Sequence, residues 1–377
     1  MTYDWVVIGA GFTGAALAYE LVKKGFSVLL LEQNAVPDNA TRYSYGGLAF
    51  WSGTNLLTRQ LCDEGKQRYS ELLHELGNDI EYREIDLLLT IDADSDPNII
   101  AESYSRFQTP PQLLSVEAAC ELEPLLNKNA LSGALTVKHG HIQPEKTAQA
   151  YIQAFLNLGG KIQITKVLDI QSLGVEYKNL AICAGGITRQ LLNKFGIFVQ
   201  QYFTHAEILE TAPVNVKLST LVMPAVLQRF GFEAKAGRDD EIWRHPGNEP
   251  EPAILDTGVV QFLDGSLRIG QISRTLTDPE AKIHAKESEK WLRDSIGCIF
   301  PCLSSVPATW HHCLVAFSKD SLPLVGAVPK QDNIYIFSGF SNPLVYIPPL
   351  AYRFANWALG QKDEIIDQLS PNRFRNF

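Results

Sequence analysis

Three glycines and one acid near the start of the chain have types and spacing suited to nucleotide binding. Gly9, Gly11 and Gly14 form a G-x-G-x-x-G pattern, and Glu32 follows 18 residues after the last glycine. The first glycine permits a sharp turn, the second leaves the backbone amides open to a pyrophosphate, and the third lets a helix pack closely on a strand. An acid at position 32 suits a ribose with a free 2′-hydroxyl, which favours FAD or NAD over NADP.

The elements that must position these residues follow from the hydrophobic pattern. Residues 5–8 form a continuous apolar run typical of a buried strand, and residues 15–21 have helical periodicity. Gly25 ends that helix, and residues 27–31 form a second apolar run that leads to Glu32. This order predicts a βαβ unit whose helix N-terminus faces the phosphates of a dinucleotide.

Length, composition and charge narrow the class of protein. A chain of 377 residues is expected to form two domains, and 45% hydrophobic with 20% charged residues is ordinary for a globular protein. The formal net charge of -9 disfavours the basic surface that binding to a nucleic-acid backbone requires. We expect no membrane span, no signal peptide and a cytoplasmic location, because no apolar stretch approaches roughly 20 residues. The six cysteines lack C-x-x-C pairs, so we expect reduced thiols and no metal site.

Further motifs continue along the rest of the chain. They lie at residues 40–48, 113–117, 140–144, 179–186, 320–326, 337–341 and 370–374. Gly185, after an apolar strand, and Gly339, at a turn, are positions where the backbone can approach a planar ligand without an intervening side chain. In order and spacing these motifs resemble the D-amino-acid oxidase superfamily, the group that holds glycine oxidase and monomeric sarcosine oxidase. The resemblance implies FAD as the cofactor.

The same resemblance implies the fold class. It is α/β, with a Rossmann-like FAD-binding domain and a second α+β substrate domain built on an antiparallel sheet. We expect the FAD-binding domain to comprise residues 1–78, 135–197 and 318–377, and the substrate domain to comprise residues 79–134 and 198–317.

Three local features are predicted within this organisation. Asp264-Gly265 between two apolar runs predicts a β-hairpin. A helix is expected at residues 279–295, with Trp291 and Leu292 facing the sheet. Pro349 is expected to open the final long helix.

The glycine motif and the resemblance together name the cofactor-binding candidates. They are Gly9, Gly11, Phe12, Thr13, Gly14, Glu32, Gln33, Thr41, Arg42, Ser44, Gly46, Gly47, Val167, Ala184, Gly185, Cys313, Gly339, Phe340, Ser341 and Asn342. Cys313 stands where sarcosine oxidase carries the cysteine that bonds covalently to its flavin. A flavin thioether at Cys313 is therefore one hypothesis, and a small buried thiol is the other.

The residues that would bind a substrate depart from the pattern of the relatives. Where relatives carry an arginine for the substrate carboxylate, this chain has Val315 at one position, and Phe50 and Trp51 at another. A bidentate clamp needs a guanidinium, so we name Arg244 as the preferred candidate and Arg229, Arg42 and Arg268 as alternatives. An aromatic wall for a less polar amine is the other possibility, formed by Phe50, Trp51 and Tyr202.

Two further residues are catalytic candidates. His311 and His312 are adjacent on an expected strand and point to opposite faces, so only one can place a proton beside the flavin, and we name His312. Tyr346 stands where sarcosine oxidase carries a lysine in its last loop. The missing lysine favours a dehydrogenase over an oxidase.

The expected function is oxidation of the C–N bond of a small amine or amino acid, by hydride transfer to FAD. An FAD-dependent 2-hydroxy-acid dehydrogenase is the enzyme alternative, and an FAD-holding subunit of a larger complex is the non-catalytic one. The fold alone cannot separate them. Modification of tRNA is disfavoured by the acidic charge balance.

Overall fold

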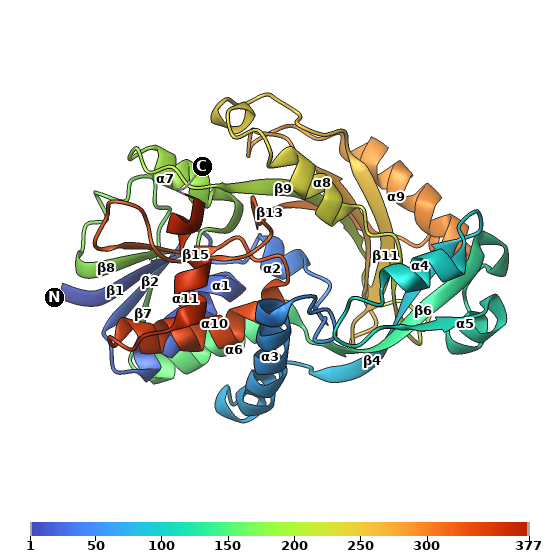
Figure 1. Cartoon of the computed structure of the whole chain (residues 1–377), viewed down its shortest axis with the longest axis horizontal. Helices are drawn as coiled ribbons and strands as arrows, with labels where there is room; N and C mark the ends of the chain where they lie inside the picture. The colour runs from blue at the N-terminus through green and yellow to red at the C-terminus, as the bar shows by residue number, and fades with distance from the viewer. Residues whose placement is uncertain (1, 375–377) are drawn as a thin grey trace.

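The computed structural model describes residues 2–374 as two β-sheets flanked by helices (Figure 1). Residues 1 and 375–377, which the expected FAD-binding ranges include, lie outside the described residues. In Figure 1 the N-terminal strand belongs to the sheet at the left, and the second sheet curves through the right-hand side of the molecule.

The first sheet has six strands in the order β14-β15-β8-β1-β2-β7. All neighbouring pairs are parallel except β14 with β15. The central strands are apolar on both faces, as expected for a parallel sheet covered on both sides. The bounds are β1 (Thr2–Ile8), β2 (Val28–Glu32), β7 (Lys161–Ile164), β8 (Glu176–Ile182), β14 (Leu324–Ala327) and β15 (Ile334–Ser338).

Helix α1 (Phe12–Lys23) is buried over most of its length because it packs on the first sheet between two other helices. These are α6 (Pro144–Asn157) and α10 (Pro343–Ala358), with α3 (Leu56–Glu75) beyond α10. The prediction that Pro349 opens the last long helix is wrong. The helix begins at Pro343, which follows the N-cap residue Asn342, and Pro349 lies buried inside it. Tertiary packing here outweighs the helix-breaking tendency of proline.

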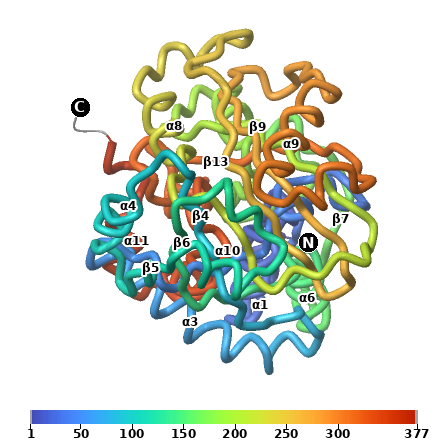
Figure 2. The backbone as a smooth tube through the Cα atoms, turned by 90° about the vertical axis from the view of Figure 1, so that its right-hand side faces the viewer, coloured from blue at the N-terminus to red at the C-terminus, as the bar shows by residue number. Residues whose placement is uncertain are grey.

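The second sheet has nine strands, in the order β13-β9-β12-β11-β10-β4-β6-β3 with β5 paired to β6. Figure 2 looks onto this end of the molecule. The bounds are β3 (Gly47–Leu48), β4 (Arg83–Asp92), β5 (Gln112–Leu114), β6 (Leu131–His141), β9 (Gln201–Glu210), β10 (Leu221–Pro224), β11 (Ile254–Gln261), β12 (Leu267–Arg274) and β13 (Thr309–Ser318). All these pairs are antiparallel except β10 with β4. The predicted hairpin is confirmed, because β11 and β12 are joined through Gly265 with φ +90°.

Helix α9 (Ala285–Ile299) covers the outer face of the second sheet, away from the first sheet (Figure 1). The predicted helix at 279–295 therefore begins six residues too early and ends four too early. Leu292 faces the sheet as predicted, at 1% exposure, whereas Trp291 is 38% exposed. The inward stripe is Ser288, Leu292, Ile296 and Ile299, a helical spacing that leaves position 291 on the flank.

The remaining helices lie in the connections. They are α2 (Ala40–Tyr43), α4 (Pro97–Ser103), α5 (Val116–Leu122), α7 (Thr188–Asn193), α8 (Arg229–Ala236) and α11 (Glu364–Leu369). The fold class predicted from the sequence is confirmed. The domain boundaries stay a prediction: every strand of the first sheet falls in the ranges expected for the FAD-binding domain, but β6 crosses the expected boundary at residue 135 and β3 joins the second sheet.

An ion-pair network connects the segment after β2 to the second sheet. Arg42 in α2 forms two hydrogen bonds with the Glu210 carboxylate on β9, at 2.6 and 2.8 Å. Arg268 on β12 contacts the same carboxylate at 3.2 Å, and Arg42 also contacts Glu145 of α6 at 3.2 Å. Because the Glu210 side chain is only 17% exposed, water screens these contacts weakly.

Replacing Glu210 by alanine is expected to destabilise the protein by about 2–3 kcal/mol, because two guanidinium groups then face each other without their shared carboxylate. Chemical denaturation followed by circular dichroism measures this change. Glu241→Ala is the matched control, since the exposed Glu241 forms a surface ion pair with Arg244, and it should cost less than about 1 kcal/mol. Equal losses in the two variants would contradict the proposed importance of the network.

Candidate FAD-binding site

The glycine turn between β1 and α1 is packed too closely for side chains. A Cβ on Gly14 would lie 1.8 Å from the Gly9 carbonyl oxygen, and a Cβ on Gly9 would lie 2.6 Å from the Cys183 carbonyl oxygen. Gly9 also has φ +100°, a left-handed conformation that favours glycine. The motif therefore brings α1, β1 and the end of β8 together at one point.

The N-terminus of α1 faces the segment around α2. Its N-cap residue, Gly11, has no side chain with which to cap the helix. The Thr41 hydroxyl instead accepts a hydrogen bond from Phe12 N at 2.9 Å, and Asn39 in turn accepts from Thr41 N and Arg42 N. Beyond Phe12 N, the helix N-terminus offers its remaining amide donors and the positive end of the helix dipole to an anion such as a pyrophosphate.

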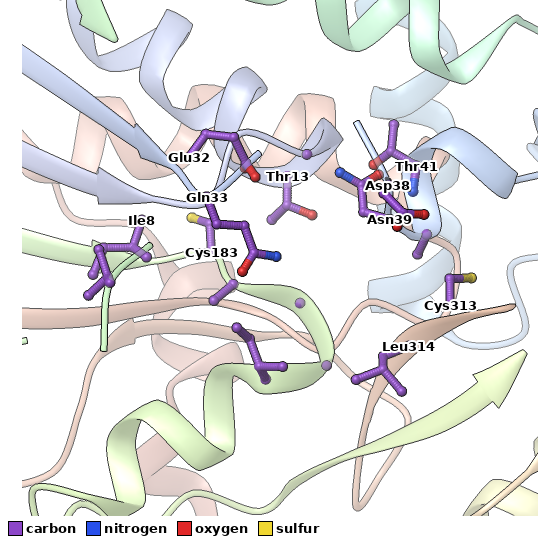
Figure 3. Close-up of a pocket in the computed structure, with 18 of the residues that line it drawn as sticks. Ile8, Thr13, Glu32, Gln33, Asp38, Asn39, Thr41, Cys183, Cys313 and Leu314 are labelled. Atoms are coloured by element: carbon purple, nitrogen blue, oxygen red, sulfur yellow. Dashed lines mark hydrogen bonds between the residues drawn. The ribbon is translucent and has the colours of Figure 1, made fainter. Parts of the chain in front are cut away.

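A cavity of about 360 Å³ extends from this helix N-terminus (Figure 3). Glu32 and Gln33 lie on one side of the close-up, and Cys313 and Leu314 of β13 lie on the other. Glu32 closes β2, and its carboxylate accepts from Ala10 N at 2.7 Å and from Asn34 N at 3.1 Å. These bonds fix the carboxylate beside the turn, at the position where the sequence pattern predicts a ribose contact.

The cavity brings together many of the residues predicted from the sequence. Those among its lining are Gly9, Gly11, Thr13, Glu32, Gln33, Thr41, Val167, Ala184, Gly185, His312 and Cys313. They come from the turn between β1 and α1, from α1, the end of β2, α2 and β13, and from the segments that precede and follow β8. This donor set fits a dinucleotide such as FAD, because backbone amides and small residues surround the helix N-terminus and an acid lies at the end of β2.

The other cofactor-binding candidates lie outside the lining of this cavity. Phe12 and Gly14 belong to α1, and Arg42 belongs to the ion-pair network described above. The rest are Ser44, Gly46, Gly47, Gly339, Phe340, Ser341 and Asn342. Two of these segments meet, because Asn342 Nδ2 donates to Ser52 Oγ at 3.3 Å, just beyond the Gly46-Gly47 loop. Their contact with a flavin stays a prediction.

Two catalytic candidates also lie away from the cavity. Tyr346 is buried in α10, where its hydroxyl is beside Cys62 of α3. Arg244 is about half exposed and pairs with Glu241 at 2.8 Å. The catalytic roles of Tyr346 and Arg244 stay predictions.

His312, the third catalytic candidate, lines the cavity and is held by a second histidine. His205 Nε2 lies 3.0 Å from the Asp278 carbonyl oxygen, which only accepts, so this nitrogen carries a proton. Neutral His205 must then accept at Nδ1 from His312 Nε2, 2.8 Å away. The arrangement leaves Nδ1 of neutral His312 without a proton.

Cys313 also lies in the cavity lining, as the thioether hypothesis requires. Burial raises the pKa of this thiol to about 12. The neutral thiol is therefore the expected form of Cys313 near neutral pH before any flavin is bound.

Several lining residues were not identified from the sequence. Asn39 caps α2, and an N-cap signal in Asn39-Ala40-Thr41 was available to find it. Asp38 and Leu314 carry no comparable signal, because only the tertiary structure brings their segments to the cavity. Among residues 2–374, no group of three or more His, Cys, Asp or Glu side chains is arranged to hold a metal ion. No helix in that same range has the length and apolar character needed to cross a membrane.

Gly14→Ala is expected to abolish flavin retention, because the new methyl group collides with the Gly9 carbonyl and moves α1 away from β1. The ratio of flavin to protein absorbance after gel filtration measures retention. Gly231→Ala is the matched control, since nothing lies within 4 Å of a Cβ at this helical position, and it should retain flavin as the wild type does. A yellow Gly14→Ala protein would contradict the assignment of the motif.

The histidine pair predicts an acid-sensitive stability. Burial and neighbouring His312 lower the pKa of His205 to about 4, whereas an unfolded histidine titrates near 6.5. Between these values the unfolded chain binds more protons, so stability is full above pH 6.5 and falls as the pH drops toward 4. His205→Asn is expected to reduce this loss of unfolding free energy by roughly 1.4 kcal/mol for each unit by which folding lowers the His205 pKa. Urea denaturation at several pH values measures the change. His74→Asn, at an exposed position, should keep the wild-type slope; an unchanged slope in His205→Asn would refute the assignment.

Comparison with known proteins agrees with this geometry. The chain is 25% identical to human peroxisomal sarcosine oxidase, over 100% of this chain and 96% of that protein. It is 27% identical to glycine oxidase of Geobacillus kaustophilus, over 92% of this chain and 90% of that protein. The crystal structure of a glycine oxidase from the same organism superposes with a TM-score of 0.80 at 20% identity, covering 99% of each chain.

The family model for FAD-dependent oxidoreductases of the DAO type matches residues 4–357. This match spans both sheets and nearly the whole chain. The chain therefore belongs to the DAO family of FAD-dependent oxidoreductases.

Proposed function

We propose that this protein oxidises the C–N bond of a small amine or amino acid, with FAD as hydride acceptor. The observation that carries the proposal is one cavity that joins the nucleotide cradle at Gly9–Gly14 to His312 and Cys313 on the second sheet. The names of the relatives support the choice of substrate, because sarcosine oxidase and glycine oxidase are named for amino acids.

The residues of this chain have separable roles in the proposal. When bound, FAD supplies the acceptor for the hydride that leaves the carbon bearing nitrogen. The N-terminus of α1 and Glu32 hold the nucleotide half of the cofactor. His312, with Nδ1 unprotonated, accepts a proton from the substrate ammonium group, and this transfer leaves the amine neutral. His205 positions His312 through the 2.8 Å contact between the two rings.

A cytoplasmic location completes the proposal. It is supported by the absence of disulfides among the described residues, where all six cysteines are free thiols. Reduced thiols are typical of proteins that work in a reducing compartment.

Anaerobic reduction of the bound flavin tests the function. An amino acid or its N-methyl derivative should bleach the flavin, and the corresponding 2-hydroxy acid should not. His312→Asn is expected to slow bleaching near neutral pH by about 10²–10⁴-fold, the usual contribution of a general base. His311→Asn is the matched control, because the adjacent side chain points to the opposite face and stacks on Tyr43.

Two outcomes would overturn the proposal. Bleaching by the hydroxy acid alone would indicate a 2-hydroxy-acid dehydrogenase of the same fold. Bleaching by no member of a panel of amines, amino acids and hydroxy acids, together with stable association with another protein, would indicate an FAD-holding subunit.

A further inference from the structure

Arg229 differs from the other arginines that could hold a substrate carboxylate. Arg42 uses all three of its side-chain nitrogens on Glu145 and Glu210. Arg268 uses two nitrogens, on Glu210 and on the Ser44 carbonyl. For Arg229, Nε is bonded to Glu233 at 2.9 Å, and within residues 2–374 neither terminal nitrogen has a hydrogen-bond or ionic partner.

The Arg229 side chain is held in place by buried acids. Glu233, one turn further along α8, accepts from Arg229 Nε and from the Thr204 hydroxyl of β9, the latter at 2.8 Å. Asp256 of β11 fixes the start of the helix, because it accepts from Gln228 N at 2.9 Å and from Arg229 N at 3.1 Å. Glu233, Thr204 and Asp256 are all buried. The guanidinium is therefore anchored through Nε, and its two terminal nitrogens remain as a planar fork.

The anchor places this fork near the cavity. Thr204 is paired with Val315 across β9 and β13, and Val315 lies two residues from Cys313 on the same face of β13. Cys313 lines the FAD cavity. The Arg229 charge also acts on Cys313, since it partly offsets the effect of burial on the pKa of that thiol. The Arg229 side chain is 22% exposed, so a small anion can reach it.

The acids around Arg229 do not occupy the fork. Asp256 uses both oxygens on backbone N–H groups, and Glu233 binds on the Nε side. The start of α8 is likewise capped by Asp256 and is not itself an anion site. The terminal nitrogens can therefore make two parallel charge-assisted hydrogen bonds to one carboxylate.

We propose that Arg229 is the carboxylate-binding, specificity-determining residue, so that the substrates are amino acids or N-alkyl amino acids and not simple amines. This inference rests on the proposed function, because it assigns the second anchor of the same substrate. The substrate carboxylate lies on the Arg229 fork.

Binding of acetate to the FAD-loaded protein tests the inference without turnover, because acetate has a carboxylate but no oxidisable C–N bond. Perturbation of the flavin absorbance spectrum reports binding, and acetamide is the neutral probe of similar shape. Acetate is expected to shift the spectrum, and acetamide is not. Arg229→Met should weaken acetate binding by about 10- to 100-fold, the effect of losing charge-assisted hydrogen bonds.

Two further variants keep the test independent of folding. Arg229→Lys retains the charge but lacks the fork, so it should fold and still bind acetate about 10-fold more weakly than the wild type. Arg244→Met removes an arginine that is half exposed and paired outside the cavity, and it should bind acetate as the wild type does. In anaerobic reduction, Arg229→Lys should raise the concentration of amino acid needed for half-maximal bleaching.

Equal responses to acetate and acetamide, or wild-type acetate affinity in both Arg229 variants, would overturn the inference. Failure of the inference is distinguishable from failure of the proposed function. Reduction by amines without any acetate effect would preserve C–N oxidation and remove the role of Arg229. Acetate binding that depends on Arg229, without reduction by any amine, would preserve the anion site and remove the proposed reaction.

Discussion

The close approach of backbone at the glycine turn is the constraint on which the rest of the site depends. The 1.8 Å that would separate a Gly14 Cβ from the Gly9 carbonyl oxygen leaves no room for any other residue. The same turn also touches the end of β8 through Gly9 and Cys183. Because three segments meet without side chains between them, the N-terminus of α1 is rigidly aimed into the cavity.

The second sheet adds the candidate reactive side chains to this nucleotide-binding turn. Its edge strand β13 carries His312 and Cys313 to the cavity, and β9 beside it carries His205 and Thr204. The hydrogen bond to His205 sets the tautomer of His312. Burial keeps the Cys313 thiol protonated by raising its pKa. The ion pairs of Arg42 with Glu145 and Glu210 link this sheet to the segment that follows β2.

Charged side chains near the site are arranged in two different ways. Glu210 lies between Arg42 and Arg268, a closed network in which each of the three side-chain nitrogens of Arg42 has an acidic partner. Arg229 and Glu233 form an open arrangement, in which the acid binds one side of the guanidinium and leaves the other side available. Closed networks stabilise the contact between elements, whereas an open fork is suited to recognising a planar anion.

The sequence alone determined the local chemistry of the first βαβ unit, the fold class and the FAD family. Glycine spacing, apolar runs and the Asp264-Gly265 hairpin are local signals, and each gives the same answer in isolation as in the folded chain. The sequence failed where packing outweighs local preference, as for Pro349 inside α10 and Trp291 on the flank of α9.

The choice among the arginines, the pairing of His312 with His205 and the isolation of Tyr346 from the cavity were decided by the tertiary structure. These outcomes depend on which partners surround each side chain, and those partners are distant in sequence: 107 residues separate His205 from His312, and 168 separate Arg42 from Glu210. A pattern along the chain shows that an arginine is present. Only the folded environment shows whether its donors are already used, because ionic and hydrogen-bonding partners are chosen by proximity in space.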